Sequence, residues 1–438
     1  MPSVRLMKWS TGVLILVVLA LLYLVPYPIF VRHPAPTVTE IYFADRITDA
    51  HRILIEKYNA LNSGKVRVIP IDFPNREFST NERKEILARS LRGEGDDLDL
   101  LAVDVIWVKR FARWCEPLGK YFSDQELKRL IPDGLYTCYD EGELVAVPLD
   151  LVQAVMYYRE DLIRNCDKGE EVIGMLQNQM TWPAFLRLKD KLHWKGPFYI
   201  FPASEYEGLI CIYVEILLSL KHDYFAVFGF NFNTPEGKEA LRLLADLLHK
   251  YAVTPTVVTD FTEVPSYEYF VKNDGLFIHG WTSYVRDFKN EPYDIQKERH
   301  LRKAPIPHLP GGKPASIFGG WNLMIPRFSK KKEAVVDFVK FLLRDDSQEV
   351  FYSESGHFPV VSSFYEDSAS LRKYPEIRDI RELMRTGVHR PADKGYTNNS
   401  KIMSHYFVLA IKNKISVEEA VIGATKAIES DQTMVAAR

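Results

Sequence analysis

The chain from residue 37 onward alternates between strand-like and helix-like patterns of hydrophobic positions. Three stretches rich in β-branched and apolar residues predict strands, at 37–44, 66–71 and 100–106. Between them, Leu54 and Tyr58 lie at helical spacing after the capping candidates Thr48 and Asp49, and a charged stretch at 81–92 predicts a second helix. This order is typical of a parallel sheet with helices on both faces, which binds ligands at the carboxyl ends of its strands.

A proline marks the next change in the pattern. The strand predicted at 144–147 runs into Pro148, and another strand is predicted at 153–158. Because proline has no N–H for a central ladder, we expect a break between two strands at this point. Later helices are expected after four capping residues, Thr181, Thr234, Ser329 and Ser416.

The N-terminal segment is apolar enough to span a membrane. No charged residue lies between Lys8 and Arg32, and 13–25 is an apolar run without interruption by charge. As a helix, this segment can cross the ~30 Å hydrocarbon layer of a bilayer. Because Arg5 and Lys8 precede it, the positive-inside rule places the rest of the chain outside the cytoplasm. We expect an uncleaved anchor; a cleaved signal peptide and a buried core helix are the alternatives.

Composition excludes some classes of partner. The 438 residues suffice for two or three domains, and a hydrophobic fraction of 47% is ordinary for a folded chain. Lys plus Arg number 56 against 58 Asp plus Glu, a formal net charge of −2. A nucleic-acid partner is therefore not expected, because such binders carry a basic excess or stripe.

Motifs for catalysis or metal binding are absent from the sequence. It contains no nucleophile elbow, Walker A loop or dinucleotide fingerprint, and its 11 histidines show no metal-ligand spacing. We expect no catalysis, no cofactor and no metal. Paired carboxylates such as Glu205 and Glu207 could do the acid–base work of a glycosidase, but such acids are more commonly solvated or hydrogen-bonded to a ligand. The four cysteines either include a Cys115–Cys138 disulfide or are all packed thiols.

Several stretches, in their shared order and spacing, resemble the extracellular solute-binding proteins of ABC importers, in the carbohydrate-type group that includes maltose-binding protein. The matching stretches are 101–107 (LAVDVIW), 144–148 (LVAVP), 156–162 (MYYREDL), 181–185 (TWPAF), 272–281 (KNDGLFIHGW), 304–312 (APIPHLPGG), 318–326 (FGGWNLMIP) and 356–360 (GHFPV). Together they extend the resemblance over nearly the whole chain after the N-terminal segment.

The resemblance implies an α/β, periplasmic-binding-protein-like fold, with two α/β lobes joined by hinge crossings and preceded by one N-terminal transmembrane helix. The crossings are expected at three places, 148–151, 318–320 and 388–393. The bounds that follow are 1–37 for the anchor or signal segment and linker, 38–148 plus 320–387 for the N-terminal lobe, and 149–319 plus 388–438 for the C-terminal lobe.

A sugar cleft needs flat aromatic surfaces and hydrogen-bonding side chains, because sugars present both apolar C–H faces and hydroxyls. Trp107 and Trp281 match stacking positions of the family, and Trp321 follows a glycine pair in which Gly320 allows close approach. For each tryptophan a core position is the alternative. The polar candidates are Asp45 and Arg46 after the first strand, Asp150 and Gln153 past the hinge proline, Glu205 and Tyr206 at a helix start, and Tyr396 in the third crossing.

The resemblance implies the substrate-binding component of an ABC import system, which closes around a carbohydrate-like solute and delivers it to the permease. The expected partners are this solute, the transmembrane subunits of the permease, and the membrane through the N-terminal helix. We expect a monomer anchored to the cell membrane, with its globular part on the periplasmic or extracytoplasmic side. An extracytoplasmic solute sensor and an exported carbohydrate-active enzyme are the alternatives.

Overall fold

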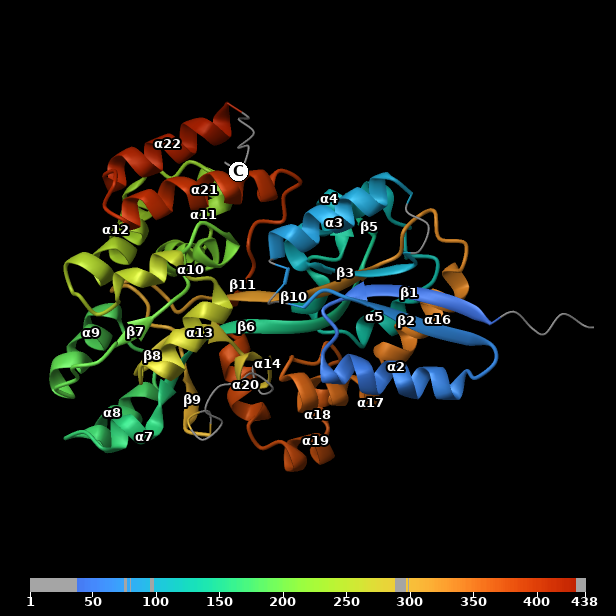
Figure 1. Cartoon of the computed structure of the whole chain (residues 1–438), viewed down its shortest axis with the longest axis horizontal. Coiled ribbons are helices and arrows are strands. Elements are labelled where there is room, and N and C mark those ends of the chain that lie inside the picture. Colours follow the sequence, from blue (N-terminus) through green and yellow to red (C-terminus); the bar gives the residue numbers. More distant parts are fainter. Residues whose placement is uncertain are drawn as a thin grey trace, which may run out of the picture.

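The computed structural model describes residues 38–430 except 75–76, 79, 95–97, 288–296 and 298. Its main strands are β1 (Thr39–Asp45), β2 (Val66–Asp72), β3 (Leu100–Asp104), β6 (Val147–Arg159), β7 (Tyr199–Ile200), β8 (Phe277–Trp281), β9 (Leu301–Ala304), β10 (Ser316–Met324) and β11 (Gly387–Val388). In the described part they form one sheet in the order β2-β1-β3-β10-β6-β8-β7, with β11 beside β10 and β9 beside β6 (Figure 1).

The first half of the sheet has the predicted parallel arrangement. Strand β1 pairs in parallel with both β2 and β3. The connections are α2 (Asp49–Leu61) and α3 (Thr80–Arg92), and Thr48 caps α2 in a capping box with His51. The strand and helix pattern predicted over 37–106 is therefore confirmed, and β3 passes into the 3-10 turn η1 (Val105–Trp107).

The expected strand break at Pro148 is wrong. Strand β6 is continuous from Val147 to Arg159 and pairs antiparallel with β10 on one side and β8 on the other. Pro148 lies opposite Asn322, where the register of β10 shifts between Trp321 and Asn322. A register shift leaves ladder groups unpaired, so a proline near the strand start is tolerated there.

Two separate hydrophobic clusters form the cores. One is built from segments between Ile41 and Leu151 together with segments between Phe318 and Ile380 and with Tyr396, and the other mainly from 155–317 and 388–427. Strands β6 and β10 run through both clusters, which lie in the left and right halves of Figure 1. The chain therefore folds as two bodies joined by crossing strands.

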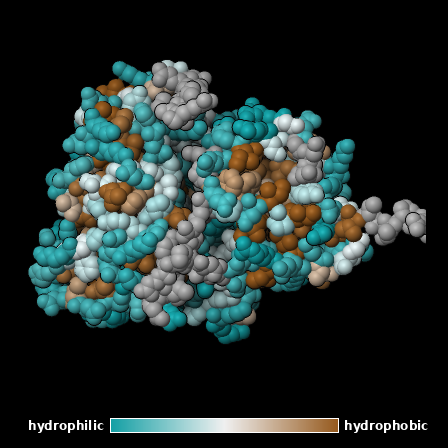
Figure 2. All heavy atoms as spheres, in the orientation of Figure 1, coloured by the Kyte–Doolittle hydropathy of each residue, from teal (hydrophilic) through white to brown (hydrophobic). Residues whose placement is uncertain are grey.

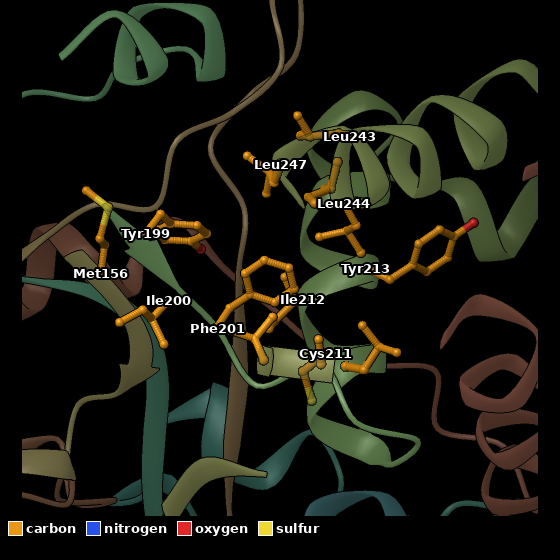
Figure 3. Packing of buried hydrophobic residues seen from close by; sticks show 14 of the residues in the cluster. Met156, Tyr199, Ile200, Phe201, Cys211, Ile212, Tyr213, Leu243, Leu244 and Leu247 are labelled. Carbon is orange, nitrogen blue, oxygen red and sulfur yellow. The ribbon is translucent and has the colours of Figure 1, made fainter. Parts of the chain in front are cut away.

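Helices pack around the second cluster. Those that contribute most are α9 (Trp182–Lys191), α10 (Glu207–Leu220), α12 (Pro235–His249), α13 (Glu263–Lys272), α21 (Tyr396–Ile411) and α22 (Val417–Glu429). Figure 3 shows side chains of α10 and α12 packed towards Tyr199 and Phe201. On the face shown in Figure 2, hydrophilic residues are interspersed with hydrophobic patches on both halves.

Two further sequence predictions concern the N-terminal segment, expected to span a membrane, and the cysteines, of which Cys115 and Cys138 could form a disulfide. The predicted transmembrane segment and its linker lie outside the described residues. Within the described ranges, no helix has the length and apolar character needed to cross a bilayer. All four cysteines are thiols, so the Cys115–Cys138 disulfide is not formed.

Candidate functional site

Two polar side chains of β6 lie where this strand passes from one core cluster to the other. Asp150 and Gln153 are both buried, and Asp150 Oδ2 lies 2.9 Å from His357 Nδ1. Asp150 Oδ1 has no hydrogen-bond partner within the described residues. Gln153 Nε2 donates instead to Ser316 Oγ at 2.6 Å and to the Leu383 carbonyl at 2.8 Å. Asp150 therefore retains a free acceptor, whereas the Gln153 amide joins β6 to β10 and to the segment at Leu383.

The acid at the end of β1 is already paired inside the protein. Asp45 is buried, and its Oδ1 accepts from Arg83 Nη2 at 2.8 Å while Oδ2 lies 3.1 Å from His51 Nε2. Burial acts to raise the pKa of Asp45, but His51 and Arg83 outweigh it and hold that pKa below its ordinary value. Asp45 thus positions Arg83, a residue that the sequence analysis did not select.

Arg46 connects the two halves. Its guanidinium forms an ion pair with Asp287, which ends α14 (Tyr284–Asp287) in the other half of the molecule. Asp287 also accepts from Ser283 and lies 3.9 Å from His357 Nε2. His357 therefore stands between Asp287 and Asp150. Burial acts to lower the pKa of His357, but these two acids, Asp150 first, raise it overall.

Two of the three candidate tryptophans lie in contact. Trp107 is only 1% exposed and belongs to the first core cluster, with its ring centroid 6.0 Å from that of Trp321. Trp321 is half-buried, and the guanidinium carbon of Arg83 lies 4.0 Å from its ring centroid. In the sheet, Trp321 lies between Asp104 of β3 and Asp150 of β6. The structure therefore places Trp107 behind Trp321 rather than at the surface.

The third tryptophan lies against the glycine pair. A Cβ atom at Gly319 would stand 3.0 Å from the Trp281 ring, so this glycine leaves the room for the indole. Gly320 has φ of +138°, and a Cβ there would stand 2.5 Å from the Asp150 carbonyl oxygen. The groups that approach the glycine pair closely are therefore the Trp281 ring, at Gly319, and the backbone of β6, at Gly320. Trp281 is itself half-buried.

The candidates near α10 fall into different environments. Glu205 is exposed and lies 3.2 Å from His405 Nδ1. The Tyr206 hydroxyl is buried close to Glu263, and burial raises the pKa of this glutamate to about 6. Tyr396, which is fully buried, donates to Glu207 Oε1 at 2.9 Å. Tyr396 thus supports the start of α10, and Glu205 stays apart from the other candidates.

Sequence reasoning missed Arg390, a side chain that bridges the two halves. This buried arginine donates to Asp104 of the first half at 3.0 Å and to Glu207 of the second half at 2.8 Å. Both acids hold the pKa of Arg390 well above its ordinary value despite its burial. The signal available in the sequence was the Arg390-Pro391 step within the third expected crossing.

A cavity of about 680 Å³ opens beside the first half. Its charged lining residues are Lys109, Arg110, Arg113, Arg327, Lys394, Asp140, Glu141 and Glu143. Arg110 lies one turn after Trp107, and Lys394 lies two residues before α21. The cavity is therefore next to the boundary and has more basic than acidic groups.

The arrangement suits binding. In the described ranges, no group of three or more His, Cys, Asp or Glu side chains is placed to hold a metal ion. Glu207 is engaged by Arg390 and Tyr396, while Glu205 faces solvent, so the two acids do not flank a common space. The boundary combines half-buried indoles with charged hydrogen-bonding groups, which can enclose a small polar molecule.

Comparisons with known proteins agree with this description. A family model described as bacterial extracellular solute-binding protein matches residues 51–349. A probable ABC transporter-binding protein of Deinococcus radiodurans is 23% identical over 368 residues, covering 82% of this chain and 85% of its own. Maltose-bound MalE3 of T. maritima superposes with a TM-score of 0.80 at 25% identity, covering 90% of this chain and 100% of its own.

A further solved structure shows the same fold. The ABC transporter solute-binding protein of Thermotoga lettingae, bound with α-D-tagatose, has a TM-score of 0.74 at 20% identity and covers 90% of this chain and 99% of its own. The expected periplasmic-binding-protein-like α/β fold is thus confirmed. The match to the family model covers more than half of the chain, and the chain belongs to the bacterial extracellular solute-binding protein family.

Proposed function

We propose that this protein is the substrate-binding component of an ABC importer, and that it binds a carbohydrate-like solute between its two halves and delivers it to a permease. The observation that carries this proposal is the boundary itself, where β6 and β10 cross between two cores beside Trp281, Trp321 and the free Oδ1 of Asp150. Relatives named for maltose and tagatose binding support a carbohydrate-like solute.

The proposed lobes are 38–148 plus 320–387 and 149–319 plus 388–438. The two hydrophobic clusters support this division, since each is built almost wholly from one of these sets. Crossing strands that belong to both cores allow hinge closure without unfolding either one. Closure brings Arg46 of one lobe to Asp287 of the other, so this ion pair stabilises the closed form.

We assign the binding groups as follows. Trp321 and Trp281 provide apolar faces for the solute, and burial of one sugar face on an indole contributes about 1–2 kcal/mol. Asp150 accepts a hydroxyl hydrogen, and Arg46 lies beside it. Trp107 and Asp45 do not contact the solute in this proposal. Trp107 packs against Trp321, and Asp45 accepts from Arg83, so they hold these two side chains in place.

The solute-binding role involves no catalysis in this proposal. The named relatives are binding proteins, and the carboxylate of Glu207 is paired with Arg390. We also propose that the apolar N-terminal segment tethers the lobes to the outer face of the cell membrane. Membrane fractionation with N-terminal sequencing tests the tether, since a soluble product trimmed near Ala35 contradicts it.

Calorimetry with a saccharide and polyol panel tests the binding role. We expect saturable one-to-one binding with no chemical change of the solute after prolonged incubation. Formation of a product from any panel member contradicts the proposal and favours an enzyme. Deletion of the permease genes should then abolish uptake of the bound solute.

A further inference from the structure

Lys84 is a buried lysine that forms a long ion pair with Glu85. It lies in α3, one residue after Arg83, and its side chain is 0% exposed. In the described part of the chain its Nζ has no hydrogen-bond partner, and the acid closest to it is Glu85 at 3.4 Å. An ammonium group that leaves water without good hydrogen bonds is strongly unfavourable, so its surroundings indicate a missing anion.

Other cations converge on the same place from both lobes. Arg110 of α4 (Val108–Phe111) shares Glu85, with 3.9 Å between Nη2 and Oε1. Lys401 comes from α21, a helix of the other lobe that contacts η1. Burial first, and then the charges of Lys401 and Arg110, lower the pKa of Lys84 to about 8. Lys84 and Arg110 therefore lie 3.4 Å and 3.9 Å from the Glu85 carboxylate, and the charge of Lys401 acts on the same groups.

Further donors adjoin these cations. Thr397 lies one turn before Lys401 on the same face of α21, and its buried Oγ1 has no partner among the described residues. Arg83 Nε is also buried without a partner, and the Arg83 guanidinium covers one face of Trp321. Helices α3 and α21 lie on the same side of the sheet in Figure 1. The donors thus extend from the proposed solute surface at Trp321 towards α21.

Closure has an electrostatic consequence at this place. Moving α21 of one lobe towards α3 of the other brings Lys401 closer to Lys84, which opposes closure in the absence of a counter-charge. A solute that carries an anion reverses this effect, because its charge pairs with lysines of both lobes. A neutral solute adds no counter-charge for Lys84 beyond the Glu85 carboxylate at 3.4 Å. The cluster therefore discriminates by charge.

We propose that Lys84, Arg110 and Lys401 form a subsite for an anionic group, a phosphate or a carboxylate, on the transported solute. This inference rests on the proposed function, since it specifies the solute as an acidic sugar or polyol. The cavity of about 680 Å³ adjoins this cluster through Arg110, which is part of its lining.

The experiment uses inorganic phosphate, glucose 6-phosphate, glucuronate and glucose as probes at constant ionic strength, with the Tm and calorimetry as readouts. In the wild-type protein we expect saturable stabilisation by inorganic phosphate and tighter binding of either acidic sugar than of glucose. The stronger of the two acids distinguishes phosphate from carboxylate recognition. Lys84→Met and Lys401→Met should each raise the Kd for the acidic probe about tenfold or more.

Two controls separate an anion site from a structural lysine. Without any anion, Lys84→Met should keep or raise the Tm, because it removes a buried charge whose ammonium makes no hydrogen bond within the described residues. Lys272→Met, in an exposed lysine of α13, should change nothing. A clear fall in the Tm of Lys84→Met without anion, or equal phosphate stabilisation in Lys84→Met and wild type, overturns the subsite.

The outcomes also separate this inference from the proposed function. If neutral sugars bind and the acidic probes do not, the anion subsite is wrong and the solute-binding role stands. If phosphate binds through Lys84 but no sugar or polyol of either charge does, the subsite stands and the carbohydrate-like solute is wrong.

Discussion

Arg46 and Asp287 join the two lobes directly, with 2.5 Å between Nη2 and Oδ1. Arg46 follows β1 of the first lobe, and Asp287 ends α14 of the second. Both side chains are less than a fifth exposed, so water screens this pair less than a surface pair. Because the residues lie in different halves of the molecule, we expect their contact to form only when the two halves approach each other.

Removal of this pair should weaken solute binding by destabilising the closed form. We expect Arg46→Met and Asp287→Asn each to raise the Kd of the bound solute by roughly tenfold, mainly through faster dissociation. Stopped-flow fluorescence measures the two rates. The double variant should be little worse than either single one, since both remove the same contact.

Arg52→Met is the matched control, because Arg52 pairs with Asp49 on the exposed face of α2. If Asp287→Asn leaves the Kd unchanged while Arg46→Met raises it, Arg46 acts on the solute itself and not through the lobe contact.

Arg390 should be necessary for the stability of the junction. Arg390→Met leaves the half-buried Asp104 and the buried Glu207 without their cation, and loss of one member of such a network costs about 3–5 kcal/mol. Urea denaturation followed by far-UV circular dichroism measures the loss. Arg385 is exposed and pairs with Glu382 three residues earlier, so Arg385→Met should lower the free energy of unfolding by under about 1 kcal/mol. Equal losses in the two variants would contradict the bridging role.

The tryptophans should separate into a packing and a binding class. Trp107→Ala removes a side chain that is 1% exposed and should lower the free energy of unfolding by about 3–5 kcal/mol. Trp281→Ala, at a half-buried position, should lose less stability but bind solute much more weakly. Denaturation and calorimetry on both variants check this division. A Trp281→Ala variant that binds normally would remove Trp281 from the site.

His357 should make stability depend on pH. Its pKa is raised in the folded protein, because Asp150 and Asp287 outweigh the effect of burial, while the unfolded value is near 6.5. The resulting stabilisation is complete below that pH and is lost as pH rises through the folded pKa. Wild type should therefore lose free energy of unfolding above about pH 6.5.

His357→Gln should flatten this part of the stability curve, and His222→Gln, an exposed histidine, should not. The curves come from urea midpoints measured at intervals between about pH 5.5 and 8.5, a range that surrounds the ordinary pKa of histidine. Parallel curves for wild type and His357→Gln would show that the His357–Asp150 contact has no linked proton.

Local pattern was sufficient to predict the elements of the first lobe. Alternation in 37–44 and 66–71, and the cap at Thr48, depend on residues close in sequence, and the structure has strands and a helix there. The same reasoning failed at Pro148, since the register shift in β10 that accommodates this proline lies far along the chain.

The sequence by itself determined the order of strands and helices, the family resemblance and the polar and aromatic residues near strand ends. Only the tertiary structure decided which of these side chains meet. Arg390 bridges Asp104 and Glu207, and Arg46 pairs with Asp287, because the crossing strands bring together segments separated by hundreds of residues. Periodicity reports which face of an element is buried, but a charge finds its partner through the packing of whole elements.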